Sequence, residues 1–284
     1  MSIKLFRDGR ISMFKIEDKN VKNYLLEQVT RIEKLELELT VFNSKRALSN
    51  IDKKLEVKEI GSSSLLIDAN SRGSAYYNRV KCFGGKDLDK LEQILNIYYE
   101  QDIVPCFDMT PNNINEKVSA ALSENGFVNT EQLVFMQLTP EACSGLKDEI
   151  KIVEVTQENA EEFVNIVMRS NGGMSIEKDV IERKKQYFYR PNFRNYISYI
   201  GNDAAGIGSL FISGKEGYIA NDYTFDKFRG NGIQKSLLKH RINKAKELGL
   251  ENLYTDVEFG SVSHNNMEKL GFRTVFINSF WMKV

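Results

Sequence analysis

Residues 228–234, with the sequence Phe-Arg-Gly-Asn-Gly-Ile-Gln, have the types and spacing that could bind a phosphate. The glycines Gly230 and Gly232 let the backbone turn tightly and leave N–H groups pointing outward, where they can bind an anion. A helix is expected over residues 231–248, so its unpaired first-turn amides and positive dipole end face the same point. A strand over residues 218–225 precedes the turn. This strand, turn and helix predict a site for a nucleotide-like phosphate.

The dipeptide Asn231-Gly232 has a second interpretation, because it is also the commonest two-residue turn of a β-hairpin. The residues after Gly232 favour a helix, because apolar side chains recur at helical spacing until Gly249 ends the stretch. These apolar positions are Ile233, Leu237, Leu238, Ile242, Ala245 and Leu248. Cations that suit a ligand with several phosphate charges cluster around the turn, although a solvated helix face carries such side chains as well. They are Lys227, Arg229, Lys235, Lys239 and Arg241.

The composition excludes several classes of protein. At 284 residues the chain is long enough for two ordinary domains, and 42% hydrophobic content with only four prolines is typical of a folded globular protein. Lysine plus arginine (39) equals aspartate plus glutamate (39), so no net charge draws the chain to nucleic acid or to an acidic membrane. No apolar run approaches about twenty residues and the N-terminus lacks a secretion signal, so we expect a cytoplasmic protein without a membrane segment.

The sequence predicts neither a metal site nor disulfides. The three cysteines, Cys82, Cys106 and Cys143, are widely spaced and odd in number, and the only histidines are His240 and His264. They supply neither paired metal ligands nor a disulfide framework. Cys106 lies within an apolar run, and we expect it to be a buried small hydrophobic residue rather than a nucleophile.

A polar, turn-rich stretch at residues 139–147 marks the expected domain boundary, which divides the chain into residues 1–145 and residues 146–284. In the first part, residues 20–39 have helical periodicity and are expected to pack on the N-terminal sheet. The second part mixes strands and helices, with Thr156 as the N-cap of its first helix. The strands are expected over residues 150–155, 196–200, 205–212, 218–225, 252–259 and 273–283, and the helices over residues 157–168, 176–188, 231–248 and 263–270. This order predicts a mixed central sheet covered by helices, an α/β (α+β) fold.

The first part repeats the end of this pattern. Residues 119–138 parallel residues 264–282: each segment has a short helix, a Gly-Phe pair and a strand, and comes after a longer helix and a strand. A diverged tandem duplication explains the similarity, and the alternative is two unrelated helix–Gly-Phe–strand turns. The first copy has Gly84-Gly85, without an arginine, where the second has its phosphate turn. We therefore expect the first copy to bind no phosphate.

The C-terminal half, about residues 150–284, resembles the GNAT superfamily of acyl-CoA-dependent N-acyltransferases. The family's pyrophosphate motif reads Gln or Arg, two residues, Gly, one residue, then Gly or Ala. Arg229, Gly232 and Gln234 stand at these positions, with a further glycine directly after the arginine. Gln234 departs from the usual small residue, so its side chain could crowd the phosphates. The ending at residues 268–272 (Glu-Lys-Leu-Gly-Phe) is also the family's usual closure before its last strand. The resemblance implies two tandem GNAT-like domains, each a mixed central sheet flanked by helices, with a degenerate N-terminal half.

By this resemblance the co-substrate is acetyl-CoA, and no metal is implied. The backbone of residues 223–225 would pair with the pantetheine arm, the amides from Arg229 to Lys235 would hold the pyrophosphate, and Asn265 could hydrogen-bond to the arm. The expected cofactor-binding residues are Tyr223, Thr224, Phe225, Arg229, Gly230, Asn231, Gly232, Ile233, Gln234, Lys235 and Asn265.

Acyl transfer to an amine needs a base for the amine proton, a backbone N–H that polarises the thioester carbonyl, and an acid for the leaving thiolate. The expected catalytic residues are Asp222 and Glu258 as bases and Tyr223 as acid, with Tyr254 as the other tyrosine available for that role. Asp256, on the Glu258 face of its strand, is a third carboxylate. Each carboxylate could instead be solvated, and Tyr223 could be a packed aromatic residue. Many GNAT enzymes place a tyrosine four residues before the Gly-Phe pair, but here that position is Met267, which cannot donate a proton.

Three functions remain open. The first is an N-acetyltransferase that moves an acetyl group from acetyl-CoA to a primary amine of a small molecule or an amino terminus. The second, suggested by Met267, is a non-catalytic acyl-CoA-binding sensor. The third, an aminoacyl transferase that uses charged tRNA, is disfavoured because the sequence has no long inserted helical arm and no net positive charge. The sequence leaves the acceptor amine and the oligomeric state open.

Overall fold

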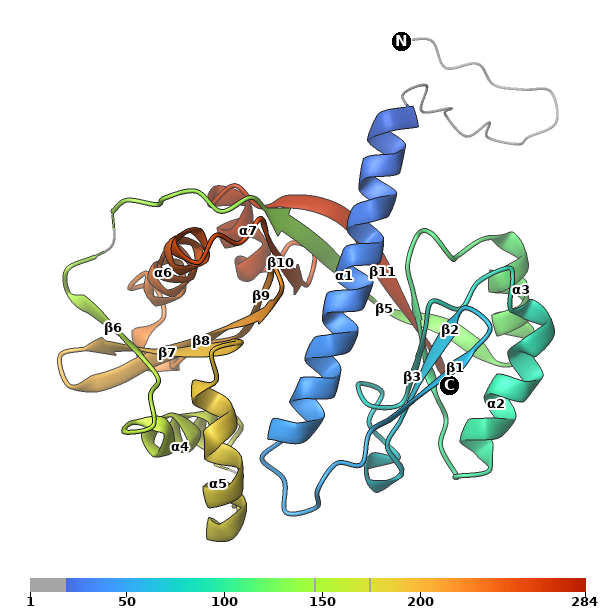
Figure 1. Cartoon of the computed structure of the whole chain (residues 1–284), viewed down its shortest axis with the longest axis horizontal. Helices are drawn as coiled ribbons and strands as arrows, with labels where there is room; N and C mark the ends of the chain where they lie inside the picture. The colour runs from blue at the N-terminus through green and yellow to red at the C-terminus, as the bar shows by residue number, and fades with distance from the viewer. Residues whose placement is uncertain (1–18, 146, 174) are drawn as a thin grey trace.

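The computed structural model describes residues 19–145, 147–173 and 175–284, except for the side chains of residues 19–23 (Figure 1). These residues form two lobes joined by strands that run from one lobe to the other. Residues 1–18, which begin the predicted first domain, lie outside the described residues. No helix within the described ranges has the length and apolar character needed to cross a membrane.

One mixed sheet runs through both lobes, in the order β1-β2-β3-β4-β11-β5-β10-β9-β8-β7-β6. Its strands are β1 (Glu56–Ile60), β2 (Ser63–Ile67), β3 (Arg79–Lys81), β4 (Cys106–Met109), β5 (Phe127–Leu138), β6 (Ile150–Glu154), β7 (Phe193–Ile200), β8 (Asp203–Ser213), β9 (Glu216–Thr224), β10 (Asn252–Val257) and β11 (Arg273–Lys283). Among these described strands, only β3 with β4 and β9 with β10 pair in parallel. Each parallel pair is joined by a crossover that contains a helix, because parallel strands cannot be linked by a tight turn.

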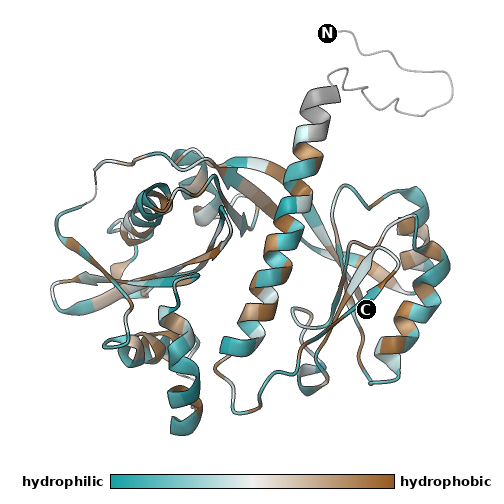
Figure 2. Ribbon diagram, viewed as in Figure 1, coloured by the Kyte–Doolittle hydropathy of each residue, from teal (hydrophilic) through white to brown (hydrophobic). Residues whose placement is uncertain are grey.

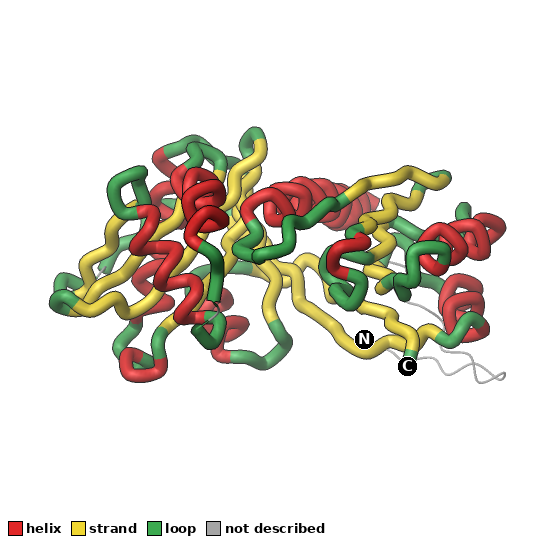
Figure 3. The backbone as a smooth tube through the Cα atoms, turned by 90° about the horizontal axis from the view of Figure 1, so that it is seen from below, coloured by secondary structure: helices red, strands yellow, loops and turns green. Residues whose placement is uncertain are grey.

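The last strand of each half is inserted into the sheet of the other half. β5 pairs antiparallel with β10, and β11 pairs antiparallel with β4. β5 and β11 also pair with each other along most of their length. Figures 1 and 3 show these two long strands running between the lobes. The boundary near residue 145 therefore divides the sequence but not the sheet.

Helices cover both faces of the sheet. The described α-helices are α1 (Lys19–Arg46), α2 (Leu91–Tyr99), α3 (Glu116–Glu124), α4 (Ala160–Ser170), α5 (Lys178–Lys184), α6 (Ile233–Glu247) and α7 (Val262–Lys269). α1 stands between the lobes (Figure 1), and its buried Ile32 and Leu35 belong to one core with α4, β7 and β8. α6 and α7 enclose a second core, and α2 and α3 a third. In Figure 2 hydrophobic residues follow the strands of both lobes, whereas α5 is largely hydrophilic.

The predicted mixed sheet flanked by helices is confirmed, as are the strand, turn and helix around Gly232. The predicted N-cap Thr156 is wrong: Asn159 directly precedes α4, and the Thr156 hydroxyl accepts a hydrogen bond from the Glu158 amide (3.3 Å) in the turn before it. The helix expected over residues 20–39 is confirmed and longer. Its buried face packs on the C-terminal half, not only on the N-terminal sheet as predicted, because β5 and β11 bring the two halves together around it.

Candidate active site

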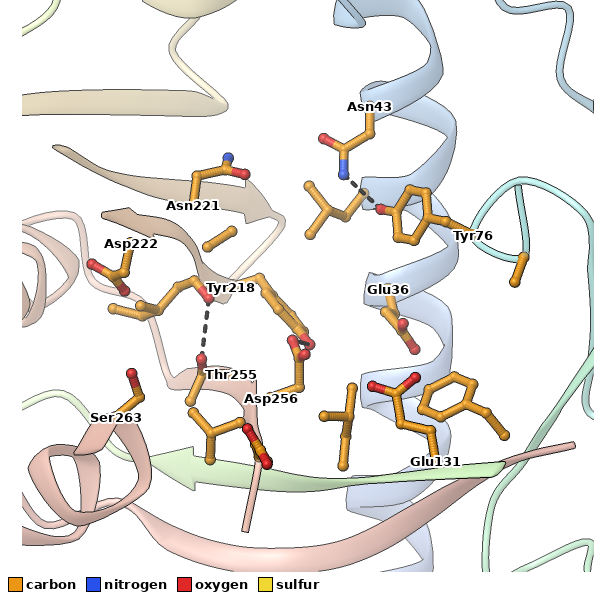
Figure 4. A pocket seen from close by; sticks show the side chains of 18 of the residues that line it. Glu36, Asn43, Tyr76, Glu131, Tyr218, Asn221, Asp222, Thr255, Asp256 and Ser263 are labelled. Atoms are coloured by element: carbon orange, nitrogen blue, oxygen red, sulfur yellow. Dashed lines mark hydrogen bonds between the residues drawn. The ribbon is translucent and has the colours of Figure 1, made fainter. Parts of the chain in front are cut away.

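The parallel strands β9 and β10 separate soon after they begin to pair. They are paired only at residues 216–218 of β9 and residues 252–254 of β10. Beyond Tyr218 the two strands diverge, and the space between them opens into a cavity of about 790 Å³ (Figure 4). The walls come from β9, β10, α1, β5 and the loop that carries Tyr76, so both lobes contribute to the cavity.

β9 carries a bulge where it borders the cavity. The register with β8 shifts between Ile207 and Ser209, and Asn221 has φ +53°, a left-handed conformation that asparagine tolerates better than most residues. A bulge leaves its extra residue outside the ladder and re-aims the local backbone. Residues 222–225 carry the backbone N–H groups that are expected to polarise a thioester carbonyl. They therefore follow directly after the bulge, where the β8–β9 ladder is interrupted.

A buried arginine fixes this bulge. Arg241 of α6 is fully buried, donates to the Ser209 carbonyl (3.0 Å) and forms a close ion pair with Asp222. Its guanidinium passes so near to Gly208 that a Cβ there would lie 2.8 Å from Cζ, which explains the glycine. Burial raises the pKa of the Asp222 carboxyl, and Arg241 opposes that rise. Asp222 as a base stays a prediction, but its ion pair favours a role in positioning the bulge.

The other two predicted catalytic residues lie apart from each other. Glu258 is exposed and lines the cavity rim just after β10. Tyr223 turns its ring away from the main cavity, into a separate hollow of about 180 Å³ that it shares with Phe163 of α4. It packs edge-on against Phe225, with ring centroids 5.1 Å apart. Glu258 and Tyr223 thus line different cavities.

The glycine turn has the backbone geometry expected of an anion cradle. Gly230 and Gly232 have φ values of +83° and +86°, which L-residues rarely adopt, and no neighbour lies within 4 Å of the place of a Gly230 Cβ. α6 begins at Ile233, and Ser236 donates to the Gly232 carbonyl (3.0 Å). The three amides before Ser236 have no acceptor within the helix, as at any helix start. The Arg229 side chain is largely exposed and paired with Asp226 (2.8 Å).

Gln234, the departure from the family motif, points its side chain toward α7. Its amide nitrogen donates to the Ser263 hydroxyl (2.9 Å), and its oxygen accepts from Asn266 (2.7 Å). The predicted Asn265 is exposed on the same helix, and its neighbour Asn266 makes the contact with Gln234 instead. Held in this way, the Gln234 side chain joins α6 to α7 in the cavity wall.

A tyrosine–carboxylate pair lies where β9 and β10 diverge. The hydroxyl of the buried Tyr218 donates to Asp256 Oδ1 at 2.6 Å, and both residues line the cavity (Figure 4). Burial raises the pKa of the Asp256 carboxyl; the Tyr218 hydrogen bond opposes this rise and the nearby Glu36 adds to it. Burial likewise holds the pKa of Tyr218 well above its usual range. Burial raises the pKa of both Asp222 and Asp256, but Asp222 is paired with Arg241, whereas Asp256 has a hydroxyl partner and no cation, so Asp256 is the better candidate for a general base.

The opposite wall carries a charge network that the sequence did not reveal. Glu36 of α1 bonds to Arg79 (3.1 Å) and Lys81 (2.8 Å), and both cations also contact the buried Asp108. Glu131 of β5 faces the same cavity. The partners lie far apart in the sequence, so only the packing of α1 against β3 and β4 brings them together. Among the described residues, no group of three His, Cys, Asp or Glu side chains could hold a metal ion.

Two further residues that were singled out in the sequence line this cavity. Met267, at the position where a tyrosine is usual, is buried and lines the cavity. Cys106, expected to be a buried hydrophobic residue, is only 2% exposed, and burial raises the pKa of its thiol to about 12. A thiol with that pKa is not a nucleophile at neutral pH.

Residues 160–272 match the sequence model of the Acetyltransferase (GNAT) family. This part of the chain is a GNAT acetyltransferase domain. The GNAT domain contains α4, β9, the glycine turn, α6 and β10, so the cradle and the diverging strands both lie within it. A comparison with curated proteins finds no matching sequence.

Solved structures resemble both lobes together. A GCN5-related N-acetyltransferase from Kribbella flavida has a TM-score of 0.65 and 12% identity, over 89% of this chain and 94% of its own. A tandem GNAT protein from the clavulanic acid biosynthesis pathway has a TM-score of 0.59 and 11% identity, over 94% and 95%. A conserved protein of unknown function from Staphylococcus epidermidis has a TM-score of 0.59 and 13% identity, over 81% and 94%. These likenesses confirm the predicted tandem GNAT fold.

The N-terminal lobe repeats the element order of the GNAT domain, since β3, α2 and β4 follow one another as β9, α6 and β10 do. After β3, the chain passes Cys82 (φ +60°) and Gly84-Gly85 before it reaches α2. The buried carboxylate of Asp87 lies within this turn and accepts hydrogen bonds from the Ser62 amide (2.9 Å) and the Ser63 hydroxyl (2.8 Å). An internal carboxylate so close to the turn disfavours a phosphate by like-charge repulsion. That this lobe binds no phosphate stays a prediction.

Proposed function

We propose that this protein is an acetyl-CoA-dependent N-acetyltransferase that acts on a primary amine of a small molecule or an amino terminus. The observation that carries the proposal is the position of the glycine cradle, which lies at the start of α6, beside diverging strands that open into a cavity lined by the partly buried carboxylate of Asp256. We further propose that residues 146–284 form the catalytic unit. The unit of residues 1–145 supplies the opposite wall of the cavity through α1 and β5.

The cradle supports the binding of the pyrophosphate of acetyl-CoA. Two left-handed glycines and a helix start without a side-chain cap leave room and amides for an anion. Gln234 is held toward α7, which supports a cradle that its side chain does not crowd. Beyond Tyr218, β9 no longer pairs with β10, so its edge can pair with an extended pantetheine arm as an added strand would. The predicted cofactor contacts from Tyr223 to Lys235, and Asn265, stay part of this proposal.

The cavity supports proton transfer from an amine. In the proposed reaction the amine nitrogen attacks the thioester carbonyl carbon, a C–N bond forms, and the C–S bond breaks. Asp256 accepts the proton lost by nitrogen, directly or through a water, while the Tyr218 hydroxyl holds the carboxylate in place. Amides of the β9 bulge polarise the carbonyl oxygen. The leaving thiolate, with an ordinary thiol pKa of about 8.5, takes a proton from water near neutral pH, so Met267 does not prevent turnover.

A binding titration and a subsequent turnover assay test the proposal. Acetyl-CoA is titrated into the protein by calorimetry, with free CoA and ATP for comparison, and thiol release is then measured with a panel of amines. We expect roughly micromolar affinity for CoA species, weaker binding of ATP, and amine-dependent thiol release. No preference for CoA species over ATP contradicts the cofactor assignment.

A second candidate function rests on Met267, whose buried thioether occupies the place of the usual tyrosine in the cavity wall. A protein that binds acetyl-CoA and reports it, without transferring the acetyl group, would need the cradle but no acid there. Tight acetyl-CoA binding without thiol release over the whole amine panel supports this candidate. Thiol release by the wild-type protein excludes it.

A further inference from the structure

Two of the carboxylates that face the cavity are neutralised by cations within the protein. Glu36 is shared between Arg79 and Lys81, and Asp222 is paired with Arg241. Asp256 bonds to a hydroxyl rather than to a cation. One cavity cation, Arg46, is held by no carboxylate among the residues that the structure describes, so we consider it in detail.

Arg46 ends helix α1 at the boundary between the main cavity and the smaller hollow beneath α4, and it lines both. Its Nε donates to Asn43 Oδ1 (2.7 Å), and one terminal nitrogen reaches Asn221 Oδ1 (3.4 Å). The guanidinium lies over the ring of Phe193, 4.6 Å from the centroid, and 5.6 Å from that of Phe188. Neutral amides and aromatic rings surround this cation, and none of them balances its charge.

Such an environment leaves the arginine able to bind an anion. Burial lowers the pKa of Arg46 to about 10, so it remains charged at neutral pH. A charge removed from water without an opposite charge is costly, and a ligand carboxylate would relieve that cost. The planar guanidinium presents paired N–H donors that match the two oxygens of a carboxylate.

The cation and the proposed base lie at different parts of the same cavity. In Figure 4 Asn43 and Asn221, the two partners of Arg46, face each other on one side, whereas Asp256 and Glu131 lie on the other. Along β9, Asn221 is three residues beyond Tyr218, the partner of Asp256, so Arg46 and Asp256 border different stretches of this strand. A ligand that spans the cavity can therefore present an anion to Arg46 and an amine to Asp256.

We infer that the acceptor is a diamino acid such as lysine, whose carboxylate binds Arg46 while its side-chain amine lies at Asp256 and reacts. This inference rests on the proposed acetyltransferase function and specifies its substrate class. A simple amine would leave Arg46 without a counter-charge. The amino terminus of a long peptide would bring no carboxylate near the reacting nitrogen.

Matched acceptors test the inference. Each diamino acid is compared with the diamine that lacks only its carboxylate: lysine with 1,5-diaminopentane, and ornithine with 1,4-diaminobutane. We expect kcat/KM for the amino acid to exceed that for its amine by roughly tenfold or more in the pairs that react, as expected for a charge-assisted hydrogen bond. Equal or better use of the amines overturns the inference.

Arg46 variants locate the effect. Arg46→Gln should raise KM for the amino acid by roughly 10- to 100-fold, leave kcat within about threefold, and abolish the preference over the amine. Arg46→Lys, which keeps the charge and most of the packing, should retain part of the preference. The matched control is Arg190→Gln, since Arg190 also stacks on an aromatic ring (5.1 Å from the Tyr187 centroid) but does not line the cavity. A loss that is equal for amino acids and amines contradicts the assignment of Arg46.

A binding experiment covers the case of no turnover. Lysine and 1,5-diaminopentane are titrated by calorimetry into the wild-type protein saturated with acetyl-CoA. Binding of lysine in preference to the diamine supports the inference, and binding of neither, or of the diamine alone, overturns it. Failure of acetyl-CoA itself to bind is a different result, because it overturns the proposed function on which the inference rests.

Discussion

Replacing Asp222 with alanine should destabilise the protein strongly, because Asp222 is the counter-ion of the fully buried Arg241. Removing one partner of a buried ion pair costs about 3–5 kcal/mol, since the other charge is left uncompensated. Two features place Asp222→Ala at the lower end of that range. Arg241 keeps a carbonyl acceptor at Ser209 (3.0 Å), and the Asp222 side chain is 18% exposed, so water can reach the vacated position. We therefore expect a loss of about 3 kcal/mol, or a thermal midpoint lower by roughly 6–12 °C.

Urea unfolding and thermal melting at pH 7 measure this loss. The control is Asp226→Ala, which removes an aspartate–arginine pair of 2.8 Å whose side chains are 80% and 67% exposed. Exposed pairs contribute little, so this variant should melt with the wild type. Asp222→Ala with the stability of the control would refute the assignment of a structural ion pair. A further variant, Asp222→Asn, separates the two possible roles of Asp222. If Asp222 is a general base, this variant loses kcat even where the protein stays folded, whereas our account expects it to act mainly on stability.

Three further predictions concern the cradle and the base. Gly232→Val should weaken acetyl-CoA binding at least tenfold in calorimetry, because valine does not readily adopt the φ of +86° found there. The control is Gly172→Val, where φ is +79° but the residue lies outside the site. It should carry the same backbone strain of about 1–2 kcal/mol and keep the affinity. Gln234→Ala should change acetyl-CoA affinity by less than about threefold, since the side chain is bonded to α7, and a much tighter complex would show that glutamine crowds the phosphates. Asp256→Asn should lower kcat by about 10²–10⁴-fold and remove the acid limb of the pH–rate profile. That limb should lie above the usual aspartate pKa, because burial raises the pKa of Asp256 and only its ionised form accepts a proton. The raised pKa also means that Asp256 stabilises the fold at low pH and that this contribution is lost as the pH rises. Asp256→Asn should therefore unfold no more easily than the wild type at pH 7.

Local signals in the sequence were sufficient for the cradle and its surroundings. Positive φ at Gly230 and Gly232, and a helix that begins directly after them, are expected from residue type and apolar spacing over a few neighbours. The mixed sheet with its covering helices is expected from the same kind of pattern. The short strands β1 and β3 gave no comparable signal, because five or three residues are too few for a clear period.

The cavity, in contrast, depends on contacts between distant parts of the chain. Glu36 meets Arg79 across 43 positions, and the β5–β10 pairing joins the last strand of one half to the other half. Nothing near Asp222 in the sequence indicates that Arg241 will bury itself against it, so its carboxylate could not be told apart from that of Asp256. Packing of side chains decides which of the two carboxylates faces the cavity without a cationic partner.

The most direct test of this account is thiol release from acetyl-CoA in the presence of amine acceptors, measured for the wild type and for Asp256→Asn at equal acetyl-CoA saturation. We predict amine-dependent release by the wild type and a loss of at least about a hundredfold in the variant, with acetyl-CoA affinity unchanged. Equal release by both proteins would contradict the placement of the reaction at the divergence of β9 and β10.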